Sequence, residues 1–366
     1  MNKETMKKGT MRKNIMAGAM ALTMATAMVT TGLAPMENVL VHASTTTNNT
    51  FDTAKELVFN TSMVEELSKS DNVRYYKFTL DEASQLNIGV SSSSSTLYKY
   101  FTIYDENRTE VYYYESYYSD FTTGNIYLTG GNYYLKLKST CSNVTFNVTK
   151  DSLMETFTET QTANNDSIDD ANTISLAKQY KGVLGENDTK DYFKFEVPAT
   201  GKIHVNINKS DYAVASICDD SDRKYYSKYS SNGAVVDEDV TLPAGTYYFV
   251  MSFNDSGSGR GSYSFKLDYA VASPKINSVK NSGKRKMTVK WEKVEGAAGY
   301  ELQYARDKSF KSGVTKKTLK PSAGSASYSK LAKGKTYYVR MRAYANVNGK
   351  TKYSGWGSSK SVVIKK

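Results

Sequence analysis

The chain has 366 residues and a formal net charge of +11, with 30 Tyr but only two His and two Cys. An aromatic content of 12% excludes general disorder, because disordered chains lack the residues that bury surface. Two Cys exclude a disulfide scaffold and a Cys-rich zinc site, and two His argue against His-based catalysis and multi-His metal centres.

Residues 1–43 have the three parts of a secretory signal peptide. Five basic residues precede an apolar, uncharged run over 15–34, and a small-residue cleavage site at 41–43 follows. We therefore expect an exported protein, extracellular or associated with the cell wall. A retained membrane anchor is the alternative, because the run approaches spanning length. No transmembrane segment is expected after cleavage.

The next two segments repeat one another. The sequence YYKF at 75–78 returns as YFKF at 192–195, and GNYY at 131–134 returns as GTYY at 245–248. Preserved order and spacing indicate two copies of one domain. Short alternating runs between Ser-, Asn- and Gly-rich turns predict an all-β fold in which each copy is a β-sandwich. The copies are expected over 44–150 and 166–271, with a polar linker at 151–165.

These motifs, with an Asp-x-Ala opening at 52–54 and 169–171, resemble bacterial pre-peptidase C-terminal (PPC) domains. Such domains are similar to the collagen-binding domains of clostridial collagenases. The resemblance implies jelly-roll-like sandwiches of secreted proteins, used for binding or targeting rather than chemistry, and a Gram-positive source.

Residues 272–366 have a different alternation. Apolar residues alternate around Trp291 and from Tyr337 to Ala343, and Leu331 precedes Tyr337 by six residues. This segment resembles a fibronectin type III domain, with Tyr337 as a corner tyrosine whose hydroxyl bonds to nearby backbone. We thus expect three consecutive β-sandwiches, two jelly-roll-like and one immunoglobulin-like.

The charge is divided between these parts. Residues 272–366 hold 23 Lys and Arg against four acids, which gives +19, while 1–43 carry +3 and 44–271 carry −11. The basic candidates for docking onto an anionic wall polymer are Lys284, Arg285, Lys286, Lys316, Lys317, Arg340 and Arg342. A solvated Lys surface that protects edge strands is the alternative. Trp356 shares strand parity with Val362 and Ile364, so we expect it in the core rather than stacked on an arginine. Nucleic acid is not expected, because the aromatic interleaving of RNA-binding motifs is missing.

The second copy contains a candidate calcium site. Calcium takes six to eight hard oxygen ligands, and the resemblance to collagen-binding domains implies the set Asn165, Asp166, Asp188 and Asp191. That family pattern has two further acidic residues, and this sequence has Gln161 and Ala163 in their places, so those two ligands are missing. In the first copy, Thr50 and Arg74 stand in for Asp166 and Asp191. Ordinary turn and capping use of Asn and Asp is the alternative, and no other cofactor is expected.

Tyrosines cluster in the first copy. The candidates for a ligand-binding face are Tyr98, Tyr100, Tyr112, Tyr114 and Tyr117. Tyr is enriched at binding surfaces, so a glycan or collagen-like ligand is one interpretation. Cross-strand packing that stabilises a sheet is the other.

These features together predict a secreted, non-catalytic binding or adhesion protein for an extracellular polysaccharide, anionic wall polymer or matrix protein. An accessory targeting subunit of a separate hydrolase and a ligand-free spacer remain as alternatives. His204 is expected to point to solvent without a nucleophile motif around it. Cys141 and Cys218 occupy different places in the two copies, so separate thiols are expected, with one disulfide as the alternative.

Overall fold

The computed structural model describes residues 41–42, 47–93, 98–117, 119–161, 164–209, 213–230, 236–252 and 260–365. These residues form strands and no helix, so the all-β expectation is confirmed. No membrane-spanning helix is found among them. Most of the expected signal peptide, residues 1–40 and 43, lies outside the described residues. Its residues 41–42 form a short strand that pairs with Met63 and Val64.

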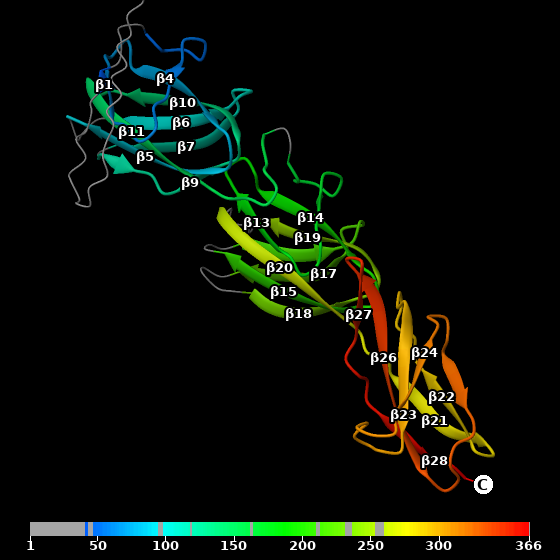
Figure 1. Ribbon diagram of the computed structural model, residues 1–366. Coiled ribbons are helices and arrows are strands. Elements are labelled where there is room, and N and C mark those ends of the chain that lie inside the picture. Colours follow the sequence, from blue (N-terminus) through cyan, green and yellow to red (C-terminus); the bar gives the residue numbers. More distant parts are fainter. Residues whose placement is uncertain are drawn as a thin grey trace, which may run out of the picture. The chain divides into compact units, whose positions relative to one another are not determined.

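The first sandwich consists of two facing sheets (Figure 1). One has the order β1-β3-β11-β5-β8 with β9 on β5, and the other β2-β4-β10-β6-β7. Their bounds are β1 Val41–His42, β2 Lys55–Glu56, β3 Met63–Glu66, β4 Val73–Leu80, β5 Ser84–Ser92, β6 Lys99–Asp105, β7 Glu110–Ser116, β8 Phe121–Thr122, β9 Ile126–Leu128, β10 Gly131–Ser139 and β11 Asn143–Ser152. Alternation puts Leu86, Ile88 and Val90 of β5 into the core.

The second sandwich repeats this arrangement. Its sheets have the orders β12-β14-β19-β16-β17 and β13-β20-β15-β18. The bounds are β12 Asn172–Thr173, β13 Gln179–Leu184, β14 Lys190–Val197, β15 Gly201–Lys209, β16 Ala213–Cys218, β17 Lys224–Ser230, β18 Val236–Leu242, β19 Gly245–Ser252 and β20 Gly261–Val271. The path β14-β19-β16-β17 has the same chain connections as β4-β10-β6-β7, which agrees with the sequence repeat. Phe193, Phe249 and Phe265 pack together in its core.

The expected linker at 151–165 has more structure than a tether. Residues 151–152 belong to β11, and the chain then packs on β13. Thr156 N donates to Lys181 O at 3.0 Å, and Lys181 N donates to Thr156 Oγ1 at 2.8 Å. Phe157 stacks on Tyr180 with ring centroids 5.9 Å apart. The aromatic ring thus anchors an otherwise polar, Thr-rich segment to the second sandwich.

The last sandwich pairs a sheet of order β21-β22-β25 with one of order β24-β23-β26-β27, in which β28 also pairs with β26. The bounds are β21 Ile276–Gly283, β22 Lys286–Trp291, β23 Gly299–Ala305, β24 Thr315–Leu319, β25 Ser325–Tyr328, β26 Thr336–Val347, β27 Lys350–Tyr353 and β28 Lys360–Val363. Trp291 and Tyr300 pack in its core at 5.8 Å. The Tyr337 hydroxyl accepts the Ala332 N–H at 3.0 Å, the contact expected of a corner tyrosine.

Candidate metal centre and binding faces

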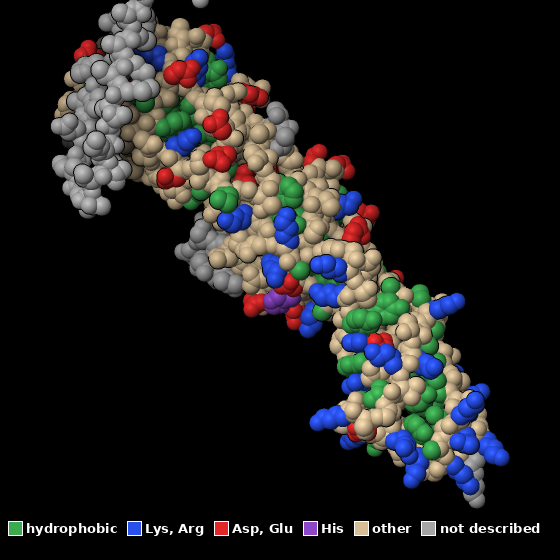
Figure 2. All heavy atoms as spheres, viewed as in Figure 1, with side chains coloured by type: hydrophobic (Ala, Val, Ile, Leu, Met, Phe, Trp, Pro, Cys, Tyr) green, Lys and Arg blue, Asp and Glu red, His purple; other side chains and the backbone are tan. Residues whose placement is uncertain are grey.

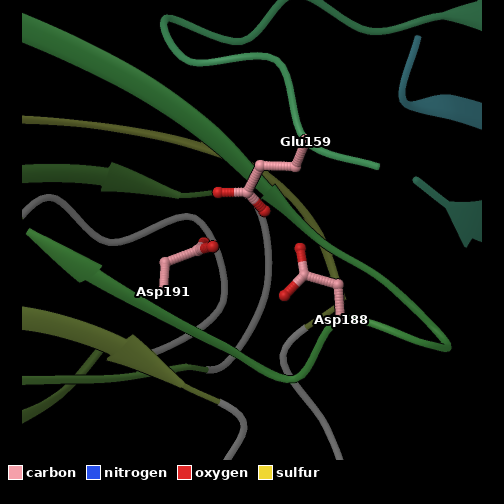
Figure 3. A group of neighbouring side chains, drawn as sticks. All are labelled: Glu159, Asp188 and Asp191. Carbon is pink, nitrogen blue, oxygen red and sulfur yellow. The ribbon is translucent and has the colours of Figure 1, made fainter. Parts of the chain in front are cut away.

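Three carboxylates converge in the second sandwich (Figure 3). Glu159 comes from the segment that packs on β13, Asp188 from the loop before β14, and Asp191 from the second position of β14. One oxygen of each lies within 4.8 Å of the others. All three are almost fully buried, with exposed fractions of 4%, 2% and 1%. They form the only such group of three or more His, Cys, Asp or Glu side chains among the described residues.

The cluster contains buried oxygens without hydrogen-bond partners. They include both oxygens of Asp188, Oδ1 of Asp166 and Asp191, and Oε2 of Glu155 and Glu159. The other Asp191 oxygen accepts the Tyr263 hydroxyl proton. An ionised carboxylate in such a place is costly unless a positive charge is close to it.

The pKa values express this cost. Burial, followed by repulsion from neighbouring acids, raises the pKa values of Asp188 and Asp191 well above their ordinary range. Burial also raises the pKa of Glu159 to about 7, and burial with repulsion from Glu159 raises that of Glu155 to about 8. The site therefore holds protons or a cation near neutral pH.

The donor set fits a hard divalent cation. It offers carboxylate oxygens from four or five residues. It contains neither His nor Cys, the ligands that zinc sites mostly use, so the donor set does not match a typical zinc site. Calcium takes oxygens at about 2.4 Å, so ligands on opposite sides of the ion lie up to about 4.8 Å apart. Glu159, Asp188 and Asp191 satisfy this span. Repulsion from Asp166 raises the pKa of Glu159, and repulsion from Glu159 raises the pKa of Glu155, so Asp166 and Glu155 both lie close enough to Glu159 to add charge.

The first sandwich has a guanidinium at the corresponding place. Tyr75 N bonds to Asn48 O at 2.6 Å as Tyr192 N bonds to Asn165 O at 2.9 Å, which aligns the two copies. Arg74 then falls on the position of Asp191. Its guanidinium contacts Glu65 at 2.9 Å and Asp71 at 2.8 Å. The first copy thus carries its own cation.

The structure brings the four expected ligands into one region and changes the set around them. Asn165 is fully buried, and its Oδ1 accepts the Tyr192 N–H at 3.3 Å. Glu159 was missed, because it stands two residues before the family position held by Gln161. Ala163 lies outside the described residues. The expectation that Thr50 stands in for Asp166 is wrong, since the Asn48–Asn165 alignment puts Asn49 there.

Four tyrosines, two exposed and two half-buried, gather at the surface of the first sandwich. The ring of Tyr98 lies 5.0 Å from Tyr100 and 4.9 Å from Tyr117, and Tyr100 lies 5.7 Å from Tyr113. The hydroxyls of Tyr98, Tyr113 and Tyr117 all bond to the Glu115 carboxylate, that of Tyr98 at 2.9 Å. We call these four residues and Glu115 the tyrosine face.

Tyr112 and Tyr114 do not belong to this face. They stack on the fully buried Phe101, with centroid separations of 5.9 and 6.2 Å. The pairing of Phe101 with Tyr114 turns both residues toward the core and turns Tyr113 outward. Tyr112 and Tyr114 are therefore packing residues, and Tyr113 is the face residue that sequence analysis missed.

The arginines of the last sandwich are engaged within the protein. Trp356 lies between them, with Arg340 at 4.2 Å and Arg342 at 4.6 Å from its ring centroid. Arg340 also donates to Gln303, and Arg342 forms an ion pair with Glu301 at 2.8 Å. The expectation that Trp356 packs in the core is wrong, and both guanidinium groups are already covered by stacking.

Of the remaining basic candidates, two have partners within the protein and three are exposed lysines. Arg285 Nε donates to Leu331 O at 2.8 Å, and Lys316 lies 3.3 Å from Glu301. Lys284, Lys286 and Lys317 are exposed. Figure 2 shows blue side chains gathered over the last sandwich, with few red ones between them. The basic surface therefore rests on lysines rather than on Arg340 and Arg342.

His204 lies outward on β15, as expected. Its Nε2 contacts Asp237 at 2.6 Å and its Nδ1 contacts Asp239 at 3.0 Å. Both ring nitrogens thus have carboxylate partners, and neither faces a nucleophile. Cys141 and Cys218 are both buried, and they are separate thiols, as expected.

Comparison with known proteins adds likenesses of limited extent. No family model and no curated protein matches the chain. A pre-peptidase C-terminal domain of a collagenase from Bacillus anthracis is 22% identical, with a TM-score of 0.24, over 27% of this chain and 94% of that one. A myokine is 13% identical with a TM-score of 0.22, over 26% of this chain and 100% of that one. A redesigned β-sandwich protein is 25% identical with a TM-score of 0.22, over 26% and 91%. These values assign no family to the chain.

Proposed function

We propose that this is an exported, non-catalytic binding protein whose first sandwich attaches to an extracellular polysaccharide or matrix protein. The tyrosine face carries the proposal. Tyr113 and Tyr117 are 43% and 52% exposed, and they adjoin two further rings. Rigid amphipathic rings grouped on a surface are typical of binding sites, because they offer large contact areas at low entropic cost.

The Glu115 network prepares this face for a ligand. Hydrogen bonds from Tyr113 and Tyr98 lower the pKa of Glu115, so its carboxylate stays charged and keeps the hydroxyls in place. Ordering a free side chain on binding costs about 0.5–1.5 kcal/mol, and rings held in advance avoid part of that cost. The rings offer stacking surface for sugar rings or apolar peptide groups, while the carboxylate accepts hydroxyl or amide protons.

Calcium in the second sandwich has a structural role in this proposal. Glu159, Asp166, Asp188 and Asp191 would hold the ion, which supplies the positive charge that their buried carboxylates lack. Binding would tie the segment that carries Glu159 to β14.

A binding assay with the full chain tests the tyrosine face. Glycan arrays and immobilised collagen serve as targets for the wild type and for the Tyr98→Ala and Tyr113→Ala variants. Each variant is expected to lose about tenfold or more in affinity, as central aromatic residues of interfaces do. Tyr229→Ala is the matched control, since Tyr229 is 60% exposed on the corresponding strand β17. The proposal is overturned if neither target is bound, or if Tyr229→Ala costs as much as Tyr113→Ala.

We further propose that the last sandwich docks onto an anionic wall polymer. Two of its four acids, Glu292 and Glu301, form three ion pairs among the described residues, with Lys275, Lys316 and Arg342. Most lysines of this sandwich therefore carry uncompensated charge. Affinity for such a polymer is expected to fall as the salt concentration rises, because the exposed charges are screened. An affinity that does not change with salt would reject this mechanism.

A further inference from the structure

The last sandwich contains a polar cavity where β23 ends. Its volume is about 420 Å³, and its walls include Tyr304, Arg306, Asp307, Ser329, Lys330 and Tyr337. Small-molecule sites have volumes of about 300–1,000 Å³, so this cavity has the size of a site for one small ligand. None of these residues is among the basic candidates considered above.

The cavity is rich in hydrogen-bond donors. Arg306 and Lys330 are exposed and form no ion pair within the described residues. The Tyr337 hydroxyl already accepts the Ala332 N–H, so its own proton is available to a ligand. The Tyr304 hydroxyl has no hydrogen bond to another described residue. Two cationic groups and two phenol groups can therefore donate to one ligand.

The carboxylate in the cavity wall is occupied by its own loop. Asp307 accepts Ser309 N at 2.9 Å, Ser309 Oγ at 2.7 Å, Lys311 N at 2.9 Å and Ser312 N at 3.1 Å. These hydrogen bonds hold the pKa of Asp307 well below its ordinary range. Asp307 thus shapes the loop, and its acceptor sites are filled before a ligand arrives. The free groups of the cavity are mainly donors.

The loop that carries Lys330 is held in position. Arg285 Nε donates to Leu331 O at 2.8 Å, and Leu331 N donates to Arg285 O at 3.1 Å. Lys330 itself has a φ of 61°, a left-handed conformation that a lysine seldom adopts. Arg285, although exposed, thus uses its Nε to hold the loop that carries Lys330.

We propose that this cavity binds one anionic sugar unit. The phosphate or carboxylate of the sugar lies between Arg306 and Lys330, because charge-assisted hydrogen bonds to these groups are the strongest that the cavity offers. The sugar ring packs against Tyr304 and Tyr337. This inference deepens the polymer-docking proposal, on which it rests for the class of ligand. The lysine surface supplies long-range attraction and the cavity supplies selectivity.

Calorimetric titration of the full chain tests the cavity. The probes are glucose 1-phosphate and galacturonic acid, with glucose and galactose as neutral controls. We expect the charged sugars alone to bind, and R306Q and K330Q each to weaken binding about tenfold or more. The stronger of the two charged probes identifies the source as a phosphate-bearing or a uronic acid polymer. K280Q is the matched control, since Lys280 is exposed on β21 and its change in charge is the same.

Some results would overturn the inference. Neutral sugars that bind as well as charged ones would do so, as would R306Q and K330Q affinities equal to that of K280Q. Thermal unfolding of the variants is expected to match the wild type, because neither side chain has an ion pair to lose.

Co-sedimentation with polygalacturonate and with poly(glycerol phosphate) separates this inference from the docking proposal. Equal sedimentation of wild type and an R306Q/K330Q double variant supports the lysine surface and overturns the cavity. Binding of a charged sugar by a chain that no polymer sediments supports the cavity and overturns polymer docking.

Discussion

Arg74 of the first sandwich and Asp191 of the second occupy the same position, the second residue of strands β4 and β14. The guanidinium of Arg74 forms ion pairs with Glu65 and Asp71. Asp191 instead adds a further acid to Glu159 and Asp188. Two copies of one domain thus balance the same buried region differently. The first copy places an arginine at this position, and the second copy has no basic side chain there.

Calcium is expected to stabilise the second sandwich. At a concentration 100 times its Kd, a ligand that binds only the folded state adds about 2.7 kcal/mol to the free energy of unfolding. Asp188→Asn should remove this response. It should also stabilise the metal-free protein, because one of the mutually repelling carboxyls becomes neutral. Chemical denaturation with calcium and with a chelator measures both effects.

Asp239→Asn is the control for that experiment. Asp239 is an exposed acid of the same sandwich, paired with Lys202 and His204, and its loss should leave the calcium response intact. An equal response in wild type and Asp188→Asn would contradict the metal site.

The metal-free protein is expected to lose stability as pH rises. Glu159 and Glu155 have pKa values of about 7 and about 8 in the folded chain, against an ordinary value of 4.5. Between pH 4.5 and 8 the folded state therefore binds more protons than the unfolded state, so the free energy of unfolding falls across this window.

Saturating calcium should abolish that fall, and calcium affinity should rise over the same window because binding displaces protons. Urea denaturation and calcium titration at several pH values measure the two effects. Stability of the metal-free second sandwich that rises from pH 4.5 to 8 would refute the assignment.

Arg74→Ala is expected to destabilise the first sandwich by about 3–5 kcal/mol, since it leaves the buried carboxylate of Glu65 without its cationic partner. The side chains of Arg74 and Glu65 are only 9% and 4% exposed, so solvent screens their interaction little. Lys77→Ala is the control, because the Lys77–Glu56 pair is exposed and should contribute less than about 1 kcal/mol. Urea denaturation measures both, and similar losses would show that Arg74 does not balance buried charge.

Trp356→Ala is expected to destabilise the last sandwich by about 2 kcal/mol, because a half-buried ring and its contacts with Arg340 and Arg342 are lost. Trp356→Phe should restore part of this. Lys317→Ala, at an exposed site, should change stability by no more than about 0.5 kcal/mol. Thermal unfolding distinguishes these outcomes, and a Trp356→Ala variant as stable as Lys317→Ala would argue against the stacked arrangement.

Sequence patterns predicted much of the fold, because strand alternation is a local property. Two sequence features were enough to predict several β-sandwiches. They are the repeat of 75–78 at 192–195 and the alternation around Trp291. Alternation along a strand turns only every second residue outward, so it implies that some of the clustered tyrosines face inward. It did not decide which ones, since that depends on the register of β7 against β6. The pairing of Phe101 with Tyr114 settled it in favour of Tyr113.

The charge distribution and the scarcity of His and Cys can be counted directly, so the amino-acid sequence by itself was enough to establish them. The sites depend on contacts between distant segments. Glu159 joins Asp188 and Asp191 because its segment is held on β13, by Phe157 against Tyr180 and by Thr156 bonded to Lys181. Arg340 and Arg342 are covered by Trp356 together with Phe310 and Tyr353, which come from other parts of the chain. Such contacts follow from three-dimensional packing, which no spacing along the chain encodes by itself.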